Sequence, residues 1–178
     1  MNTQNGVKTH FFLLIFIFLT SVTRSQTADT FKLISSAFEE GKPIPAKYTC
    51  DSINISPPLS WRGFPEKTKS FALIMDDPDA PMGTWVHWVI YNIPGTISHL
   101  EEKKSGEQIK AVDGLNSWNE KGYSGPCPPG GTHQYNFKLY ALDKILTSKE
   151  GMTKAELLDA MKDHILGETT LTGLFRNY

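Results

Sequence analysis

Aspartates and prolines stand together at the first of three points where polar residues interrupt apolar segments. Three carboxylates fall within four positions directly after the apolar run 70–75, in Asp76-Asp77-Pro78-Asp79-Ala80-Pro81. Carboxylates this close repel one another, so they require hydrogen-bond donors or cations nearby. The prolines remove backbone donors and stiffen the turn. An ordinary acidic turn is the alternative interpretation, because turns commonly use aspartate and proline.

A histidine interrupts the second segment, Trp85-Val86-His87-Trp88-Val89-Ile90, which is otherwise apolar and aromatic. The period of two in a strand places alternate residues on one face, here Trp85, His87 and Val89. The other face then carries Val86, Trp88 and Ile90. A hairpin between 70–75 and 85–93 would bring Asp77 and Asp79 near His87. The alternative is a core histidine whose ring is satisfied by a neighbouring group.

Prolines and glycines surround a second histidine in the third segment, Tyr123-Ser124-Gly125-Pro126-Cys127-Pro128-Pro129-Gly130-Gly131-Thr132-His133-Gln134-Tyr135. The prolines predict a rigid loop with few donors of its own. The glycines allow close approach of the backbone and can offer N–H groups to an anion. His133 and Tyr135 would share one strand face. Two imidazoles, a phenol and glycine amides together favour an anion-binding site.

Several apolar runs predict the strands that must position these groups. The runs are short, rich in β-branched and aromatic residues, and bounded by turn residues, at 31–38, 70–75, 85–93, 135–142 and 169–175. The stretch 39–60 is a proline-rich connection, and 96–134 is polar and mostly loop. Such a long loop indicates function or short strands that the pattern hides.

A helix is predicted after Thr153, because Glu156 stands three residues later in capping-box spacing. Its apolar stripe comprises Leu157, Leu158, Met161, Ile165 and Leu166, and Gly167 should end it. Strands come first and the helix comes near the end, without alternation. The expected fold is therefore mainly β, an antiparallel β-sandwich with a few peripheral helices, rather than a nucleotide-binding α/β fold.

Residues 1–25 are interpreted as a secretory signal, and residues 26–178 as a single domain. The apolar run 11–19 follows Lys8 and is too short to span a membrane, and 23–25 offers a cleavage site. An uncleaved anchor is the alternative. We expect a periplasmic or secreted protein with no stable membrane span after signal removal. The net charge of −1 gives no electrostatic reason to bind nucleic acid.

Cys50 and Cys127 are the two cysteines of the chain. In an exported protein an even count favours a disulfide, and two cysteines permit one intramolecular pairing. Two free thiols are the alternative. We hypothesise that Cys50 and Cys127 pair.

The three segments together resemble the phosphatidylethanolamine-binding protein family. The matching residues are Asp77-Pro78-Asp79-Ala80-Pro81, then Trp85-x-His87-Trp88, then Gly125-Pro126-Cys127-Pro128-Pro129-x-Gly131-x-His133-x-Tyr135. The earlier Tyr48-Thr49-Cys50-Asp51 and Ser56-Pro57-Pro58-Leu59-Ser60-Trp61 are similar to its bacterial branch, the Raf kinase inhibitor-like proteins. The similarity extends from about Phe31 to the C-terminus.

The resemblance implies a β-sandwich with a small anion pocket that takes phosphate, acetate or phospholipid head groups. Carried over by motif, the pocket residues are Asp77, Asp79, Pro81, Trp85, His87, Gly125, Pro126, His133 and Tyr135. Cys127 departs from the eukaryotic pattern, which has proline at that position of the loop. The kinase-regulating role of animal relatives is not transferred, because an exported chain would not meet those kinases.

The leading hypothesis is a binding module for a small anion or phosphorylated ligand, with no catalytic residue and no cofactor. A hydrolase is the first alternative, with an Asp–His base and Ser124 or Cys127 as nucleophile. An inhibitor of an extracytoplasmic protease or other enzyme is the second, and its protein partner is unknown. Two histidines and two aspartates could also hold zinc, but no His-x-x-x-His spacing supports a metal site.

Overall fold

A computed structural model describes residues 1, 30–147 and 150–177 of the chain. The predicted signal segment, residues 1–25, lies outside the described residues apart from Met1. Within the described ranges, no helix is both long and apolar enough to cross a membrane.

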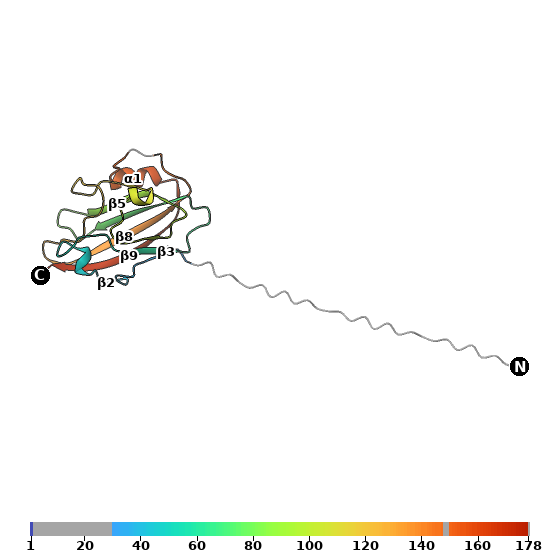
Figure 1. Cartoon of the computed structure of the whole chain (residues 1–178), viewed down its shortest axis with the longest axis horizontal. Coiled ribbons are helices and arrows are strands. Elements are labelled where there is room, and N and C mark those ends of the chain that lie inside the picture. The colour runs from blue at the N-terminus through green and yellow to red at the C-terminus, as the bar shows by residue number, and fades with distance from the viewer. Residues whose placement is uncertain (2–29, 148–149, 178) are drawn as a thin grey trace.

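Two β-sheets and a helix build the described part of the chain (Figure 1). The smaller sheet has the order β1-β3-β6, formed by Lys32–Ile34, Leu59–Arg62 and His99–Leu100. The larger has the order β2-β9-β8-β4-β5-β7, formed by Lys42–Pro43, Ile165–Asn177, Gly131–Leu142, Ser70–Asp77, Trp85–Pro94 and Val112–Asp113. All described pairings are antiparallel except that of β2 with β9. The predicted mainly β fold is confirmed.

Apolar residues cover both faces of the larger sheet because its central strands are buried on both sides. One cluster fills the space against the smaller sheet and includes Leu33, Trp61, Phe71 and Phe137. The Trp61 and Phe71 rings meet edge to face at 5.3 Å. A second cluster lies between the opposite face and α1, Lys154–Met161 (Figure 1). The larger sheet is therefore the middle layer, with an apolar cluster on each of its faces.

The hairpin predicted between the second and third apolar runs is present as β4 and β5. A register shift leaves Asp76 opposite Val86 but Met75 opposite Trp88, so His87 is the extra residue of a β-bulge. Val86 consequently packs in the same cluster as Val89, whereas Trp88 lies in the other cluster. The strict alternation predicted for 85–90 was wrong at this point, since a bulge changes which face the following residues occupy.

The predicted helix begins as expected but ends early. Thr153 is its N-cap, and the reciprocal capping box with Glu156 is formed. The helix stops at Met161, and Ile165 begins β9 by pairing with Leu142 of β8. Ile165 and Leu166 fit a helical period, but strand pairing across the sheet overrides that local pattern. Their assignment to the helical stripe was wrong.

Other boundaries also differ from the sequence pattern. The first strand is restricted to Lys32–Ile34, and the last extends from Ile165 to Asn177. The region 96–134, predicted as mostly loop, contains β6, β7, the 3₁₀ turn Glu107–Ile109 and the start of β8. A second 3₁₀ turn, Ala46–Tyr48, lies in the predicted connection. Asp76 and Asp77 belong to β4 rather than to the turn after it.

Candidate functional site

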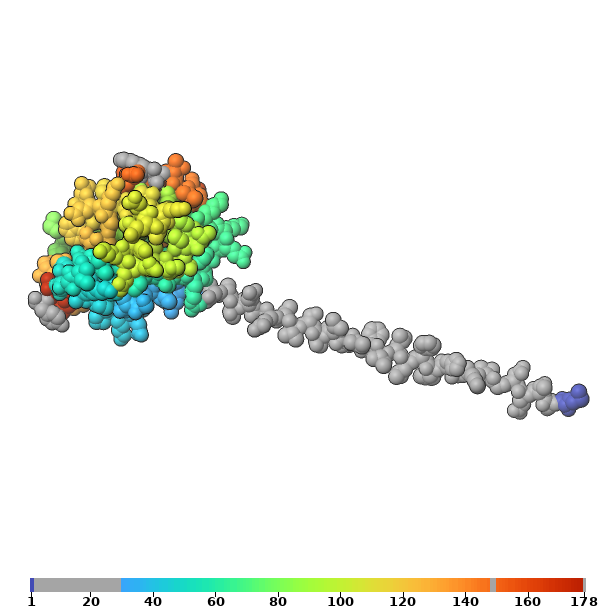
Figure 2. All heavy atoms as spheres, viewed as in Figure 1, coloured from blue at the N-terminus to red at the C-terminus, as the bar shows by residue number. Residues whose placement is uncertain are grey.

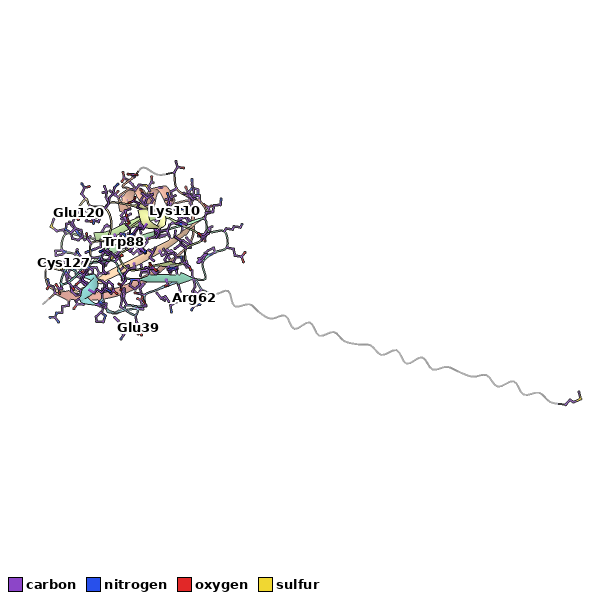
Figure 3. All side chains as sticks on the ribbon, in the orientation of Figure 1. Glu39, Arg62, Trp88, Lys110, Glu120 and Cys127 are labelled. Atoms are coloured by element: carbon purple, nitrogen blue, oxygen red, sulfur yellow. A yellow bond between two sulfur atoms is a disulfide. The ribbon has the colours of Figure 1, made fainter. Side chains whose placement is uncertain are left out.

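A cavity of about 180 Å³ opens where β4, β5 and β8 meet their connecting loops. We call it the anion pocket, after the ligand class predicted from the sequence. Its lining combines one carboxylate, two imidazoles and several apolar side chains: Asp77, Ala80, Pro81, Met82, Trp85, His87, Trp118, Cys127, Pro128, Pro129 and His133. Five of the nine residues predicted for the site, Asp77, Pro81, Trp85, His87 and His133, therefore lie together in its wall. Figure 3 shows Cys127 and Arg62 on opposite sides of the molecule, so the pocket lies away from the Arg62 end of β3.

Asp77 and His133 form a buried pair at the base of the pocket. Asp77 Oδ2 lies 2.8 Å from His133 Nδ1, and Asp77 Oδ1 accepts the N–H of Asp79 at 2.8 Å. The side chains of Asp77 and His133 are 4% and 9% exposed. Because a carboxylate can only accept, His133 carries its proton on Nδ1. Nε2 is then the ring nitrogen available to a ligand.

His87 is held in a different way. Its Nδ1 lies 2.7 Å from the carbonyl oxygen of Ser124, so Nδ1 donates to the backbone and Nε2 is again left for the pocket. Burial lowers the pKa of His87 below its usual value, although the Ser124 carbonyl and the Asp77 carboxylate oppose that shift. The ring meets Trp118 and Tyr135 edge to face, at 5.1 and 5.2 Å. His87 is therefore a rigid and, at neutral pH, uncharged wall of the pocket.

Asp79 and Tyr135 support the pocket without lining it. Asp79 Oδ2 accepts the N–H of Gln134 at 2.8 Å and ties the turn after β4 to β8. Tyr135 is fully buried beneath His87. Its hydroxyl has no hydrogen-bond partner of normal geometry among the described residues, although Asp77 is close enough to contribute to its shifted pKa. Burial, and then the negative charge of Asp77, raise the pKa of Tyr135, so the phenol stays protonated.

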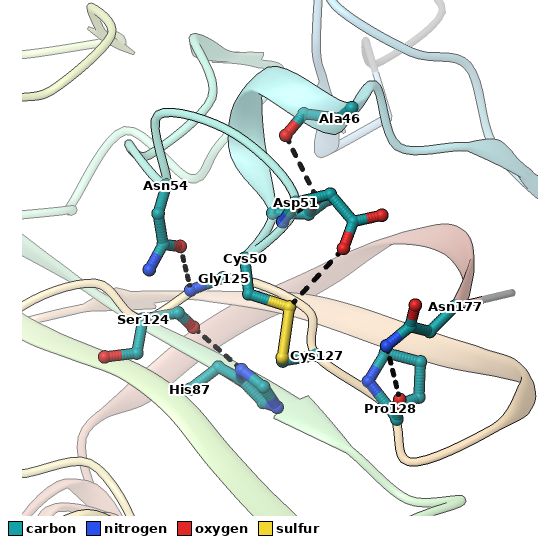
Figure 4. The surroundings of a disulfide bond; sticks show 11 residues. Ala46, Cys50, Asp51, Asn54, His87, Ser124, Gly125, Cys127, Pro128 and Asn177 are labelled. Carbon is teal, nitrogen blue, oxygen red and sulfur yellow. Dashed lines mark hydrogen bonds between the residues drawn. A yellow bond between two sulfur atoms is a disulfide. The ribbon is translucent and has the colours of Figure 1, made fainter.

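Gly125 and Pro126, also predicted for the site, lie buried behind the pocket wall. The N–H of Gly125 donates to Asn54 Oδ1 at 2.8 Å (Figure 4). A Cβ on Gly125 would lie 2.3 Å from the carbonyl oxygen of Tyr48, so glycine is required for this close approach. Because Asn54 already accepts from this amide, the Gly125 N–H is not free for an anion.

The disulfide predicted between Cys50 and Cys127 is confirmed, with the two Cα atoms 5.4 Å apart. Two hydrogen bonds reinforce it: the Cys50 N–H donates to the Pro126 carbonyl at 3.1 Å, and the Tyr123 hydroxyl donates to the Tyr48 carbonyl at 2.6 Å. Figure 2 shows the two joined segments, cyan and gold, beside one another at one end of the molecule. The loop that carries Cys127 is therefore fixed from outside the sheet.

Trp118 and Met82 are pocket residues that the sequence analysis missed. Trp118 is 43% exposed and meets Trp85 edge to face at 5.4 Å. The turn that carries it is held by Asn116, whose Oδ1 accepts the N–H groups of Trp118 and Glu120. Met82 is 92% exposed. A tryptophan within a polar stretch is the one feature of the sequence that marks this position.

The lining contains no lysine or arginine. Among the described lining residues, the two imidazoles are the groups that can carry a positive charge. Among the residues that the structure describes, no group of three or more histidine, cysteine, aspartate or glutamate side chains is arranged to hold a metal ion. Of the two candidate nucleophiles, Cys127 is oxidised, and the Ser124 hydroxyl accepts from Asn116 at 3.2 Å. It is the carbonyl of Ser124 that meets His87.

These features define a class: an antiparallel β-sandwich with a small imidazole and carboxylate pocket at the ends of its central strands. The family described as phosphatidylethanolamine-binding protein matches residues 34–176, and the chain belongs to that family. A UPF0098 protein of Methanothermobacter thermautotrophicus is 51% identical over 147 residues, covering 81% of this chain and 97% of the relative. A UPF0098 protein of Chlamydia muridarum is 48% identical over 149 residues, with the same coverage.

Two solved structures are similar to the whole sandwich. The crystal structure of a phosphatidylethanolamine-binding protein homologue from Chlamydia trachomatis superposes with a TM-score of 0.79 at 45% identity, covering 83% of this chain and 98% of that one. Escherichia coli YBCL superposes with a TM-score of 0.76 at 30% identity, covering 83% and 99%.

Proposed function

We propose that the protein binds a small anion in the anion pocket, either free phosphate or the phosphate head group of a larger molecule. The observation that carries the proposal is the orientation of His133. Its Nδ1 is committed to the buried carboxylate of Asp77, which leaves Nε2 as a donor to a bound oxygen once the ring is protonated. The family name, which refers to binding a phosphate-containing lipid, supports this ligand class.

The charge of the pocket sets the conditions for binding. One carboxylate, Asp77, lines it, while Asp79 is turned to the Gln134 amide outside. With both imidazoles neutral, the pocket is negative and repels an anion. A proton on His133 cancels the charge of Asp77 and supplies a charge-assisted donor. Binding should therefore be tighter at acidic pH, and it should take up protons.

The rim of the pocket supports a ligand larger than a free ion. Met82 and Trp118 are exposed large apolar side chains of the lining, and the lining residues Pro81 and Pro129 are exposed as well. An indole at the boundary between an apolar surface and water suits a ligand with a polar head and an apolar body. We also propose export to the periplasm or the exterior, which the disulfide supports because such bonds persist in oxidising compartments.

Sulfate titrations test the anion hypothesis, because the charge of sulfate stays fixed over the range of histidine titration. We expect tighter binding near pH 5.5 than near pH 8, on either side of the usual histidine pKa of about 6.5. Calorimetry in buffers of different ionisation enthalpy should report proton uptake. His133→Gln should abolish both effects. Equal affinity at the two pH values in the unmodified protein would refute the charge argument.

His164 provides a matched control for the histidine substitution. Its Nδ1 lies 3.0 Å from Asp143 Oδ1, so it forms the same kind of pair as His133 but lies outside the pocket lining. His164→Gln should leave sulfate binding and its pH dependence unchanged. Turnover measured on a panel of esters and phosphoesters separates the binding proposal from the hydrolase alternative. The alternative requires hydrolysis faster than in buffer alone, and a slower rate in His133→Gln.

A further inference from the structure

A second and larger hollow, of about 620 Å³, lies along the outer edge of β9 and shares no lining residue with the anion pocket. We call it the edge groove. Its walls come from β1 with Ser35, from the segment 38–40, and from Thr170 and Leu171 of β9. Figure 3 shows Glu39 at the lower margin of the molecule, on the side where Figure 1 places β2 and β9.

One end of this strand edge is already covered by the chain itself. β2 pairs with β9 only at Gly173 and Leu174. Just before that pairing, the Gly41 N–H donates to the Thr172 carbonyl at 2.8 Å. The Thr172 N–H is taken by Glu40 Oε2 at 2.9 Å. A glutamate side chain thus stands where the carbonyl of a neighbouring strand would be.

The next positions of the same edge have no main-chain partner among the described residues, although β1 packs beside them. N–H and C=O groups that point outward recur every second residue in an antiparallel strand, so those of Thr170 and Glu168 follow those of Thr172. In the ranges that the structure describes, no hydrogen bond joins the main chain of Thr170 or Glu168 to a neighbour on this outer side. An unpaired strand edge is a template for an added strand.

The opposite wall gives the groove its chemical character. Leu33 of β1 turns its N–H to Thr169 Oγ1 at 3.3 Å, so the outer edge of β1 faces β9. Ile34 is 42% exposed and, with Phe38, contributes apolar surface. Two carboxylates, Glu39 and Glu40, outnumber Lys32 among the charged lining residues. The groove therefore combines alternating backbone donors and acceptors with an apolar wall and excess negative charge.

We propose that the edge groove binds an extended peptide segment of another protein, which adds to β9 as a strand. The repeat of outward N–H and C=O groups at every second residue is matched by the backbone of an extended chain. An apolar side chain of the segment would pack on Ile34 and Phe38, and a basic one would meet Glu39 and Glu40. Binding there is independent of the anion pocket, because the two sites have separate walls.

A short capped peptide that alternates valine and lysine is the probe, added to the full chain at neutral pH. Amide hydrogen exchange should slow at Thr170 and Glu168, and sulfate binding should be unchanged. N-methylation of one alternate set of peptide amides should abolish binding, whereas methylation of the other set, which faces solvent, should be tolerated. An acidic peptide with glutamate in place of lysine should bind more weakly, and Glu39→Lys should reverse that preference.

Two substitutions at one position isolate the backbone contribution. Thr170→Pro removes the outward N–H, a change that strand edges tolerate. The substitution should lower the affinity for the peptide by about tenfold, which is the effect of losing one well-placed hydrogen bond. Thr170→Val keeps the N–H and should bind as the unmodified protein does. If Thr170→Pro fails to fold, the N-methylated peptides still test, on the unmodified chain, whether binding depends on main-chain hydrogen bonds.

The proposal is overturned if peptide binding is insensitive to N-methylation, if Thr170 and Glu168 exchange equally fast with and without peptide, or if their protection requires only a second copy of this chain. Sedimentation of the free protein distinguishes the last outcome, because self-pairing would depend on protein concentration.

Discussion

The carboxylates of Asp76 and Asp77 are adjacent in β4, and their side chains leave opposite faces of the sheet. Asp76 is fully buried on the side of α1, and its Oδ2 receives Lys138 at 3.0 Å and Lys154 at 2.5 Å. Its Oδ1 has no partner among the described residues. Asp77 faces the anion pocket and meets His133. One strand therefore supplies the same functional group to a charge cluster and to a cavity.

The two regions differ in whether their charge is permanently compensated. Two lysine side chains meet the single carboxylate of Asp76, so this cluster joins α1 and β8 to β4 and is complete without a ligand. Asp77 has a partner whose charge depends on a proton, and that partner retains a free ring nitrogen. Adjacent carboxylates can thus serve structure and binding separately, because period-two geometry gives them different partners.

Removing the disulfide should have the largest effect on stability. The anion pocket has no ion cluster like that of Asp76, and its outer wall depends on the bond between Cys50 and Cys127. The double variant Cys50→Ser with Cys127→Ser should lower the free energy of unfolding by about 4 kcal/mol at most, since the bond closes a long loop in the unfolded chain. Urea unfolding measures the loss. Equal stability of variant and parent would show that the two hydrogen bonds that reinforce the disulfide are enough to hold this wall.

Substitution of Asp76 should be next in size. Asp76→Asn leaves Lys138 and Lys154 without their carboxylate, and breaking a buried pair costs about 3 kcal/mol at the lower end of its range. The lower end applies because the two lysine side chains are 33% and 26% exposed and can reach water. Urea unfolding should show this loss, while sulfate affinity near pH 5.5, one unit below the usual histidine pKa of about 6.5, stays unchanged.

Asp77→Asn should have the opposite effects to Asp76→Asn, with a small loss of stability and a change in sulfate binding. An asparagine oxygen can still accept one of the two hydrogen bonds of Asp77, so the free energy of unfolding should fall by only about 1 kcal/mol. The substitution removes the negative charge that repels an anion, and it weakens the acceptor that orients the His133 ring. Sulfate affinity should therefore depend less on pH than in the parent. If the variant keeps the pH dependence of the parent, a group other than the Asp77–His133 pair takes up the proton when sulfate binds.

The sequence predicts the region of Asp77 better than the region of Asp76. Three motifs with matching spacing mark the pocket, and the hairpin of β4 and β5 follows from two apolar runs joined by a proline-rich turn. The pairing of Asp76 with Lys138 and Lys154 depends on β8 and α1 packing over the same face, which no local pattern reports. The sequence correctly predicted hydrogen-bond donors near the three carboxylates. Which residues supply these donors could be seen only in the folded structure.

The failures of prediction in the pocket also have physical causes. Period-two reasoning assumes an uninterrupted ladder, and the bulge at His87 breaks it. Trp118 enters the pocket from a turn organised by Asn116, in a stretch with no periodicity. The resemblance implied Gly125 as a pocket residue, and the structure shows that glycine is required there for close passage past Tyr48. The spacing of the motifs indicated which residues lie near the pocket. Which of them line it and which only support it depends on tertiary contacts.

The smallest expected effect concerns the two histidines of the pocket, which differ as the two aspartates do. Burial lowers the pKa of His87 in the folded protein, whereas in the unfolded chain it is about 6.5. Below that pH the unfolded chain binds a proton that folded His87 resists, so acidification favours unfolding. The contribution of His87 to the free energy of unfolding is constant above about pH 6.5. Below that pH it falls by at most about 1.4 kcal/mol per pH unit, until the pKa of the folded protein is reached.

His87→Asn isolates this contribution, because an asparagine amide can still donate to the Ser124 carbonyl without titrating. Urea unfolding from about pH 7.5 down to about pH 5.5 spans the pKa of the unfolded histidine. The parent should lose more stability than the variant over that range, by about 1 kcal/mol or less, and the two curves should run parallel above it. A parent that loses less stability than His87→Asn would mean that the Ser124 carbonyl and the nearby carboxylates outweigh burial. His87 would then join His133 as a source of positive charge for the pocket, and the sulfate titration of His133→Gln would keep a residual pH dependence.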